Sequence, residues 1–487
     1  MKRQSKRILA LILLTFVFFV QVPNVFATEE KTKESFDGVV AYAKLGKVPQ
    51  MEGMSISSVN GHPFEIVERD GKEAYVMKTD WRTLWLMCDV PTSIINGNPD
   101  RKNYDVEVEY YDEGKGRLVL AYPVIENGVV VNEETEAVYM KNDLCWKTAT
   151  FTMQNPCFSS HMQGKQGVDF ELSTRSEYYN FSSEKIIVSS VKLKERKDKK
   201  DVEIGITSPS FANHFFTGDK IDFDISLNNL KSTEQEVDLL IVAVDEFGVT
   251  QFSKTESMKL TPGANTFKLN EEFNRYGYFF LHVTATAKDK SMYSFERTNF
   301  SYAYSSNGEF VNDKFGYSCH WEAAKYRGAI EGGIESAHRA GVGWMRDEHV
   351  WANVEKEKGK YELSPYFTQY VEEMEEHDVK LYFLFGMGNG LYDGAGAVPY
   401  TEEGIEGWKN YCKFMARTLK DKAEAFEVWN EYNHLPFNSN PEVANNQHYY
   451  KLLKAAYEGA RSEAPDIPIV GFATAGLAVG LYTTTFD

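Results

Sequence analysis

The chain has 487 residues and a formal net charge of −18, from 53 basic and 71 acidic residues. Such an acidic chain disfavours nucleic acid and anionic membranes as partners, and it favours solubility outside the cell. Its length predicts about three domains of roughly 100–200 residues each.

The first 27 residues have the layout of a secretory signal peptide. Basic residues precede an apolar run at 8–20, and Val25-Phe26-Ala27 offers small residues before a cleavage point at Thr28. The run is short for a bilayer span, although an uncleaved N-terminal anchor is the alternative. No later segment is long and apolar enough for a membrane helix. We therefore expect a secreted, extracellular or cell-surface protein with no membrane partner after signal cleavage and no nucleic-acid partner.

The five cysteines are widely scattered and lack a metal-type spacing. They are Cys88, Cys145, Cys157, Cys319 and Cys412. A disulfide among the first three is compatible with an oxidising compartment, but a fold built on disulfides is not expected. We expect most of the five to be small buried hydrophobic residues.

Residues 28–198 carry the signals of a β-sandwich. Alternating runs, such as the one at 104–110, are separated by clusters of Gly, Asn and Asp. The order of these runs resembles that of the jelly-roll modules that accompany carbohydrate-active enzymes. Aromatic residues such as Trp81, Trp85 and Tyr111 could stack on sugar rings, but filling the core is the more common role. The sequence alone does not make this region a binding module.

A charged run at 192–200 leads into a second β domain, which we place at 199–306. We expect the run to be a solvated strand end and linker rather than a recruitment patch. Apolar and polar residues alternate at 221–227, and 237–244 is a more continuous core strand. About a hundred residues of short strands indicate an immunoglobulin-like sandwich. Nothing in it suggests catalysis, so we expect a rigid spacer.

The periodicity changes in the last region, at 307–487, where short apolar runs alternate with long amphipathic patterns. The predicted strands lie at 315–321, 343–348, 379–386, 425–431 and 467–475. The predicted helices lie at 327–340, 365–377, 402–420 and 441–464. Gly341 and Asp378 stand where helices should stop. Repeated strand–helix units without a dinucleotide-type glycine loop favour a (β/α)8 barrel, of which about five units are present.

In such a barrel the chemistry lies at the carboxyl ends of the strands. The sequence places aromatic, basic, amide and acidic side chains there, a mixture typical of a sugar site. The candidate substrate-binding residues are Asn430, Arg346, His320, Trp321, Trp429, Tyr392 and Tyr432. Glu431 is the candidate catalytic acid, because aromatic surroundings can raise the pKa of a carboxyl group enough to keep its proton near neutrality.

For several neighbouring residues, a purely structural role stays open beside a role in the site. Asp347 and Glu348 are expected to be partners of Arg346, and a structural role is favoured for His434 and Tyr400.

His320 is as readily a half-buried structural ring as a ligand contact. Metal binding by His320, Glu348 and Glu431 is conceivable, but no ligand spacing supports it. We expect no metal and no cofactor.

Three stretches of the last region carry a resemblance to a known family. Residues 341–348 are similar to a second barrel strand whose arginine, here Arg346, helps to hold the nucleophile. Residues 351–361 resemble the Trp…Glu-Pro-x-x-Gly-x-Tyr segment that follows it, with Lys356 in place of the usual Pro. Val428-Trp429-Asn430-Glu431 matches the fourth-strand signature. Together they resemble retaining glycoside hydrolases of clan A, closest to family-39-like β-xylosidases and family-5-like enzymes.

The resemblance makes Glu431 the acid/base and Asn430 the contact to the 2-hydroxyl of the reacting sugar. The family's nucleophile is a Glu at the end of the seventh strand, and only five strands are predicted here. A complete barrel needs about 250 residues. We therefore expect a C-terminally truncated piece of a longer enzyme, inactive as given, with its nucleophile outside the chain.

The implied function is that of a secreted hydrolase that cleaves O-glycosidic bonds of plant-type or related polysaccharides by a retaining double displacement. Glu431 would protonate the leaving oxygen and then activate water, while Arg346 would keep the nucleophile ionised. One alternative is a secreted, non-catalytic carbohydrate-binding or adhesion protein with a remnant barrel. Another is a metal-dependent barrel enzyme such as a lyase or deacetylase.

Overall fold

The computed structural model describes three consecutive units of the chain. The described residues are 38–77, 85–114, 116–126, 128–159, 161–162, 165–173, 185–306, 312–321, 330–393, 398–434, 443 and 445–476. The predicted signal peptide and Trp81 lie outside these ranges. Within them, no helix is both long and apolar enough to cross a membrane.

The first unit consists of two antiparallel sheets that share one apolar core. The first sheet contains β1 (Val39–Lys44), β2 (Gln50–Glu52), β4 (Glu65–Arg69), β5 (Lys72–Met77), β7 (Lys102–Tyr111), β11 (Trp146–Met153) and β15 (Ile186–Lys199). The second contains β3 (Ser55–Ser58), β6 (Trp85–Asp89), β8 (Arg117–Glu126), β9 (Val129–Glu134), β10 (Val138–Tyr139) and β14 (Phe170–Ser173), and β12 (His161–Met162) pairs separately with β13 (Lys165–Gln166). Tyr111 is nearly buried and donates its hydroxyl hydrogen to the Leu144 carbonyl, so this aromatic ring is a core group.

The charged run at 192–200 forms the end of β15 rather than a free linker. Its side chains pair across the sheet, as Lys194 does with Glu107 at 2.6 Å and Arg196 does with Asp105 at 3.0 Å. Such cross-strand pairs suit a long, half-solvated strand.

The second unit is also a pair of sheets around a single core. One sheet contains β16 (Val202–Thr207), β18 (Lys220–Asn229) and β21 (Gly263–Glu272), and the other contains β17 (His214–Phe216), β19 (Gln235–Asp245), β20 (Thr250–Leu260), β22 (Gly277–Ala287) and β23 (Tyr293–Ala303). The predicted alternation at 221–227 is confirmed, because the four apolar side chains of this stretch are fully buried. The strands β20 and β21 were not predicted.

The third unit is a β/α unit whose five strands run parallel and follow one another in chain order across the sheet. The strands are β24 (Asn312–Ser318), β25 (Val342–Glu348), β28 (Lys380–Phe385), β29 (Ala423–Val428) and β30 (Ile469–Val470). The helices are α1 (Ile330–Arg339), α3 (Pro365–Glu376), α4 (Glu402–Leu419) and α5 (Asn446–Arg461), and the short α2 (Trp351–Val354) precedes a hairpin of β26 (Glu355–Glu357) and β27 (Lys360–Tyr361). The described strands form an open sheet and do not close into a barrel.

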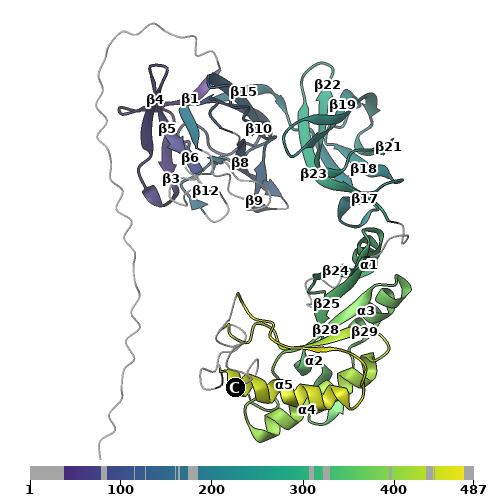
Figure 1. Cartoon of the computed structure of the whole chain (residues 1–487). Helices are drawn as coiled ribbons and strands as arrows, with labels where there is room; N and C mark the ends of the chain where they lie inside the picture. Colours follow the sequence, from purple (N-terminus) through teal and green to yellow (C-terminus); the bar gives the residue numbers. More distant parts are fainter. Residues whose placement is uncertain are drawn as a thin grey trace, which may run out of the picture.

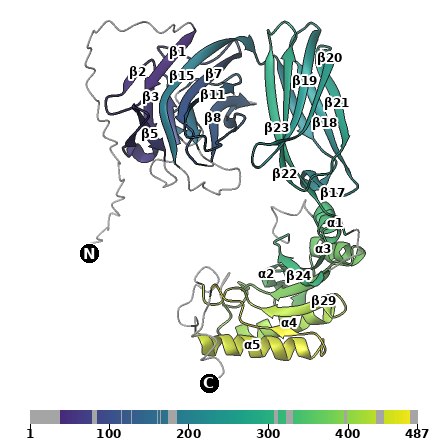
Figure 2. The same cartoon turned by 45° about the horizontal axis from the view of Figure 1, so that its top comes forward.

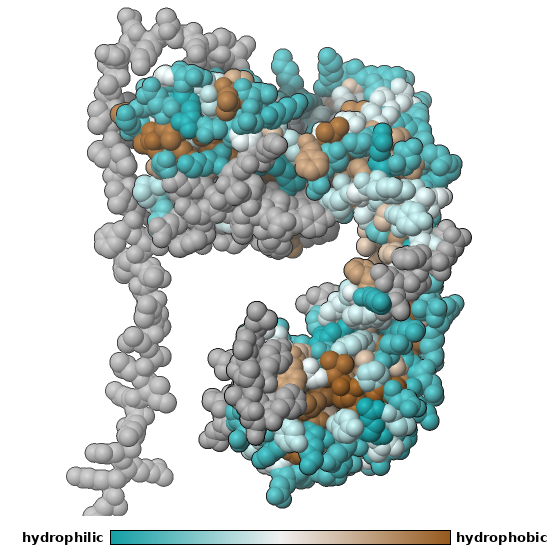
Figure 3. Space-filling model, viewed as in Figure 1, coloured by the Kyte–Doolittle hydropathy of each residue, from teal (hydrophilic) through white to brown (hydrophobic). Residues whose placement is uncertain are grey.

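Local sequence explains where these helices begin and end. Ser364 and Thr401 cap α3 and α4 by accepting backbone hydrogen bonds from the first helical turn. Gly341 and Asp378 have φ values of 80° and 53° at the two predicted stops, a left-handed conformation that ends a helix. Figure 3 shows a brown apolar area on this unit, set among teal polar residues.

The two sandwiches lie side by side, and the β/α unit lies below the second one (Figures 1 and 2). The joint between the sandwiches is broad and includes a reciprocal pair, in which the Gln154 amide donates to the Phe295 carbonyl and accepts from the Phe295 N–H. An ion pair between Arg297 and Glu134 at 2.7 Å and a bond from Asn103 to the Tyr293 carbonyl at 3.0 Å add to it.

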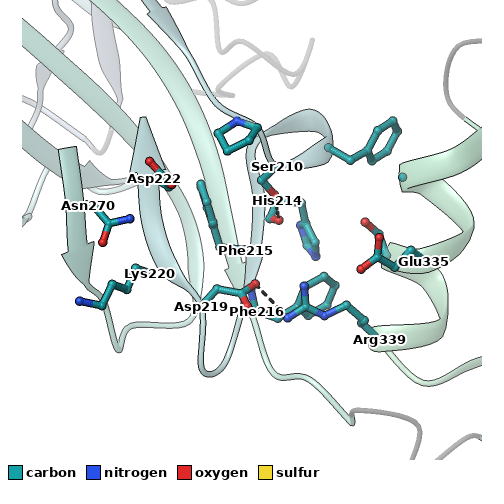
Figure 4. Close-up of a pocket in the computed structure, with 14 residues that line it drawn as sticks. Ser210, His214, Phe215, Phe216, Asp219, Lys220, Asp222, Asn270, Glu335 and Arg339 are labelled. Carbon is teal, nitrogen blue, oxygen red and sulfur yellow. Dashed lines mark hydrogen bonds and ion pairs between the residues drawn. The ribbon is translucent and has the colours of Figure 1, made fainter. Parts of the chain in front are cut away.

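The joint between the second sandwich and the β/α unit is narrower and is centred on Arg339 of α1. Its guanidinium donates to both carboxylate oxygens of Asp219 at 2.8 and 2.9 Å and lies 4.3 Å from the ring centroid of Phe216. The Arg339 carbonyl accepts from the Ser306 N–H at 2.8 Å. The Asp219–Arg339 pair lines a cleft of about 750 Å³, and Figure 4 shows Asp219 of the second sandwich and Arg339 of α1 pointing toward each other.

Candidate active site

The carboxyl ends of the parallel strands bring the predicted site residues to one edge of the β/α unit. Parallel strands end at the same edge of a sheet, which is where open and closed α/β sheets bind their ligands. Arg346 lies near the end of β25, and Asn430 and Glu431 follow β29 directly.

Arg346 holds together three of the strands at this edge. Its Nε donates to Glu427 Oε2 on β29 at 2.5 Å, its Nη2 donates to Asn430 Oδ1 at 2.9 Å, and its Nη1 donates to Ser318 Oγ of β24 at 3.3 Å. The side chains of Arg346 and Glu427 are 17% and 9% exposed, so the pair is strong and well shielded. Arg346 thereby orients the amide of Asn430.

The prediction that Asp347 and Glu348 are the partners of Arg346 is wrong for the contacts that the structure shows. Successive residues of a strand point to opposite faces, so Asp347 lies on the face of the sheet that the helices cover, and Arg346 lies on the opposite face. Glu427 takes the partner's place, and the sequence analysis missed it. The available signal was the position of Glu427 between Phe426 and Val428. These two apolar side chains face the helices, so the carboxylate between them faces the other side of the sheet.

Glu431 occupies a strained turn. Trp429 has a φ of 66° and Glu431 a φ of 45°, both in the left-handed region that is costly for large side chains. The Glu431 side chain is 37% exposed, and its Oε2 lies 3.1 Å from Nδ1 of His434. His434, for which a structural role was favoured, is therefore a direct neighbour of the candidate acid. Strain of this kind clusters at functional sites, where it holds a side chain in place.

Trp429 and Tyr432 are in the core rather than on the ligand side. They are 1% and 2% exposed, and their rings lie 5.5 Å from Trp408 and 4.8 Å from Tyr449. The left-handed turn sends the Trp429 ring toward the helices. This burial corrects the expectation that the two rings contact substrate, and it assigns them to fixing the turn that presents Glu431.

The stretch at 351–361 forms a hydrogen-bond network around the Glu355 carboxylate, called the Glu355 network below. The fully buried carboxylate of Glu355 accepts from Trp351 Nε1 at 2.6 Å and from the Gly359 N–H at 2.6 Å. Gly359 has a φ of 77°, which suits a residue without a Cβ. The Tyr392 hydroxyl donates to the same carboxylate at 2.7 Å, and burial with this bond raises the pKa of Tyr392. Tyr392, predicted to bind substrate, therefore uses its hydroxyl to hold the loop.

The first strand places His320 and Trp321 at the same edge. His320 is exposed and lies 3.6 Å from Glu348 Oε1. Trp321 is half-buried, and its N–H donates to Asp347 Oδ2 at 3.0 Å. Burial raises the pKa of Asp347 to about 7, and the neighbouring Glu348 charge adds to the rise.

Among the described residues, one group has nitrogen and oxygen atoms close enough together to suggest a cation. These atoms of His320, Asp347 and Glu348 lie within 4.8 Å of one another. The Asp347 carboxylate is fully buried and already accepts hydrogen bonds from Trp321, Glu348 and Cys319. A cation would have to displace these donors, so we assign no metal to the group.

The cysteines form no disulfide. Three are buried, as expected of small hydrophobic residues, whereas Cys145 is exposed and Cys157 is intermediate.

The comparisons with family models and with curated proteins found nothing, whereas the comparison with solved structures found many matches. The matching solved structures include a family 39 glycoside hydrolase from the gut symbiont Bacteroides cellulosilyticus, at 20% identity and a TM-score of 0.42, covering 56% of this chain and 51% of that chain. A β-glucuronidase from Parabacteroides merdae matches at 10% identity and a TM-score of 0.22, over 81% of this chain and 48% of that chain. Xylanase 10B from Thermotoga maritima matches at 17% identity and a TM-score of 0.25, over 32% of this chain and 49% of that chain.

The chain thus spans about half the length of these enzymes. The proposal below is argued from the residues of the site.

Proposed function

We propose that this chain carries the acid/base half of a retaining glycoside hydrolase site, built on the first five units of a (β/α)8 barrel. The observation that carries the proposal is the arrangement after β29. Arg346 fixes the Asn430 amide, and the next residue, Glu431, presents an exposed carboxyl group from a strained turn.

This arrangement supports a proton-transfer role for Glu431. Its carboxyl group is open to solvent, and His434 is a basic neighbour at 3.1 Å. In a double displacement, Glu431 would protonate the leaving glycosidic oxygen and, once ionised, take a proton from the attacking water. Asn430, held by Arg346, would hydrogen-bond a hydroxyl of the reacting sugar.

The second carboxyl group of the reaction is proposed to come from a seventh strand that is not among the described strands. Retaining hydrolysis needs two carboxyl groups about 5–5.5 Å apart. In this proposal Arg346, beyond its contacts with Glu427 and Asn430, helps to keep the nucleophile ionised. Substrates are β-linked oligo- or polysaccharides met outside the cell after export, and no metal or cofactor takes part.

Hydrolysis of aryl β-glycosides with good and poor leaving groups tests the proposal. The protein is made as the 487-residue chain and, separately, with any coding sequence that follows Asp487 in frame. Glu431→Gln should lower the rate on poor leaving groups by about 10²–10⁴-fold, the usual contribution of acid catalysis, and should affect activated leaving groups much less.

Glu424→Gln is the matched control, because Glu424 is an exposed residue at the opposite end of β29 and pairs with Lys380. Equal losses on good and poor leaving groups would remove Glu431 from the acid role. Glycan binding without turnover by every form of the protein would favour the carbohydrate-binding alternative.

A further inference from the structure

Two consecutive glycines lie in the first turn of α1, where they weaken the helix. A glycine costs about 1 kcal/mol relative to alanine inside a helix, so Gly332 and Gly333 need a reason in the packing around them. Neighbouring residues of an α-helix point about 100° apart. The two glycines therefore face different parts of the molecule.

Gly332 faces the second sandwich. A Cβ atom built on it would lie 2.5 Å from Cγ and 2.7 Å from Cδ2 of Phe211, so only glycine allows this approach. Seven residues further along the same face of α1, Arg339 binds Asp219. The sandwich thus contacts α1 near both of its ends, and Figures 1 and 2 show α1 next to β17.

The turn that carries Phe211 is held firmly by the sandwich. Phe211 begins a short 3₁₀ helix, η2 (Phe211–Asn213), in which Ala212 and Asn213 have φ values of 49° and 54°. This left-handed conformation is uncommon for residues other than glycine. The Asn213 amide donates to the Asn299 carbonyl of β23 at 2.9 Å. Phe211 itself is 36% exposed, so its ring is a contact between two units rather than part of the sandwich core.

Gly333 faces the candidate active site. A Cβ atom built on it would lie 2.7 Å from Cζ2 and 2.8 Å from Cη2 of Trp321. Hydrogen bonds with Asp347 and Tyr366 fix the backbone of Trp321, whereas its indole packs edge-to-face against Tyr370 of α3, with ring centroids 6.1 Å apart. The orientation of the indole therefore depends on the helices behind it.

We propose that Phe211 is a positioning residue of the candidate active site: it holds the first turn of α1 against Trp321, so the second sandwich sets the orientation of the Trp321 indole. Helix ends fray, and two glycines weaken this end further. Contacts on both sides of the turn are therefore what keep it in place. The part of Trp321 in binding glycan rests on the proposed function.

Three variants of the full chain separate this contact from other effects. Phe211→Ala removes the contact, whereas Phe211→Leu keeps an apolar side chain against Gly332 without the aromatic ring. Leu230→Ala is the matched control, because Leu230 is 41% exposed on the same sandwich and follows the end of β18 that lies away from Asp219.

The measurement is nuclear magnetic resonance relaxation of the indole N–H groups after ¹⁵N-tryptophan labelling. The chain has eight tryptophans, and the Trp321→Phe variant assigns the Trp321 signal. The order parameter of the Trp321 indole should be about 0.8 in the wild type and should fall below about 0.6 in Phe211→Ala. Phe211→Leu and Leu230→Ala should keep the wild-type value.

An order parameter of Trp321 that stays at the wild-type value in Phe211→Ala would overturn the proposal. An equal fall in Leu230→Ala would also overturn it, because the effect would then be a general loosening of the sandwich.

Titration with xylo-, cello- and manno-oligosaccharides separates this proposal from the proposed function. If Trp321 contacts glycan, Phe211→Ala should weaken binding by about tenfold at most, the usual contribution of one aromatic contact, and Phe211→Leu should restore it. A Trp321 indole that loosens in Phe211→Ala, in a chain that binds no glycan, would keep Phe211 as its support and count against the proposed function.

Discussion

The sandwiches and the β/α unit use their charges differently. On the sandwiches, acids and bases pair across neighbouring strands on half-solvated faces, as Lys72 does with Glu109 and Lys194 with Glu107. In the β/α unit, charge gathers at the carboxyl edge of the sheet, where the Arg346–Glu427 pair is well shielded. Exposed cross-strand pairs contribute little to stability and much to solubility, whereas shielded groups fix geometry. Under the proposed function, the sandwiches are scaffolds and the strand ends carry the chemistry.

Backbone strain occurs in all three units. In the sandwiches, some left-handed residues, such as Asp70 and Asn142, are of types that tolerate this conformation in turns, whereas others, such as Arg101 and Leu144, are not. In the β/α unit, Trp429, Glu431 and Phe472 adopt it directly after two neighbouring strands. Large side chains remain there only when their surroundings hold them.

The largest expected effect is a loss of stability when the Glu355 network, which holds the loop of Tyr392, is removed. Glu355→Ala leaves the buried Trp351 donor and the part-buried donors of Gly359 and Tyr392 without their acceptor, and it should lower the free energy of unfolding of the β/α unit by about 3 kcal/mol. Calorimetry should show this unit melting earlier while the transition of the sandwiches stays in place.

Glu357→Ala is the control, since Glu357 is exposed in the same hairpin. One shared transition that moves as a whole would break the division between scaffold and site.

The second effect is a pH dependence confined to the β/α unit. The pKa of Asp347 is raised to about 7 in the folded chain from 3.8, so between about pH 4 and pH 7 the unfolded chain binds fewer protons. Stability should therefore fall by about 4 kcal/mol as pH rises across this window and level off above it. Asp347→Asn should flatten the profile in urea titrations followed by tryptophan fluorescence. An unchanged slope would assign the dependence to another group.

A smaller effect is expected at the joint between the sandwiches. Gln154→Ala removes both hydrogen bonds to Phe295 and should lower the stability of the sandwich pair by about 2 kcal/mol. Any glycosidase activity should stay at the wild-type level. Gln50→Ala, at an exposed position on β2, should change neither the stability nor the activity. A loss of activity in Gln154→Ala at unchanged folding would give the sandwiches a part in the chemistry.

The smallest change in stability is expected at Arg339. Its ion pair with Asp219 is about a quarter to a third exposed on each side, so Arg339→Ala should cost less than about 1 kcal/mol. The joint should nevertheless loosen, and small-angle X-ray scattering should report a larger radius of gyration than for the wild type. Arg417→Ala, on the outer side of α4, should leave the scattering curve unchanged. Identical curves for both variants would mean that other contacts hold the joint.

The sequence predicted the alternation of strands and helices in the β/α unit well, because this alternation depends on local pattern. Strands β7 and β18 and helices α3 and α4 were predicted within two or three residues of their ends. The exposed edge strand β20 escaped prediction, since its residues are mostly polar.

The site was predicted less completely than the fold. Residue types at strand ends revealed Arg346, Asn430 and Glu431, but not which groups they touch. The Arg346–Glu427 pair joins residues 81 positions apart. The pattern of residues within one strand does not predict such a long-range contact. Trp429 was misplaced because a left-handed residue breaks the alternation that assigns faces.

The narrow joint at Arg339 also bears on how such a chain could have arisen. Each unit encloses its own core, and Arg339 requires of the second sandwich an acid at Asp219 and a ring at Phe216. A unit whose joint depends on so few residues of the neighbouring domain can be transferred between genes and still bind to a new neighbour. Different sandwich modules could therefore have been recombined with the same β/α unit, which would keep its strand-end residues while its surroundings changed.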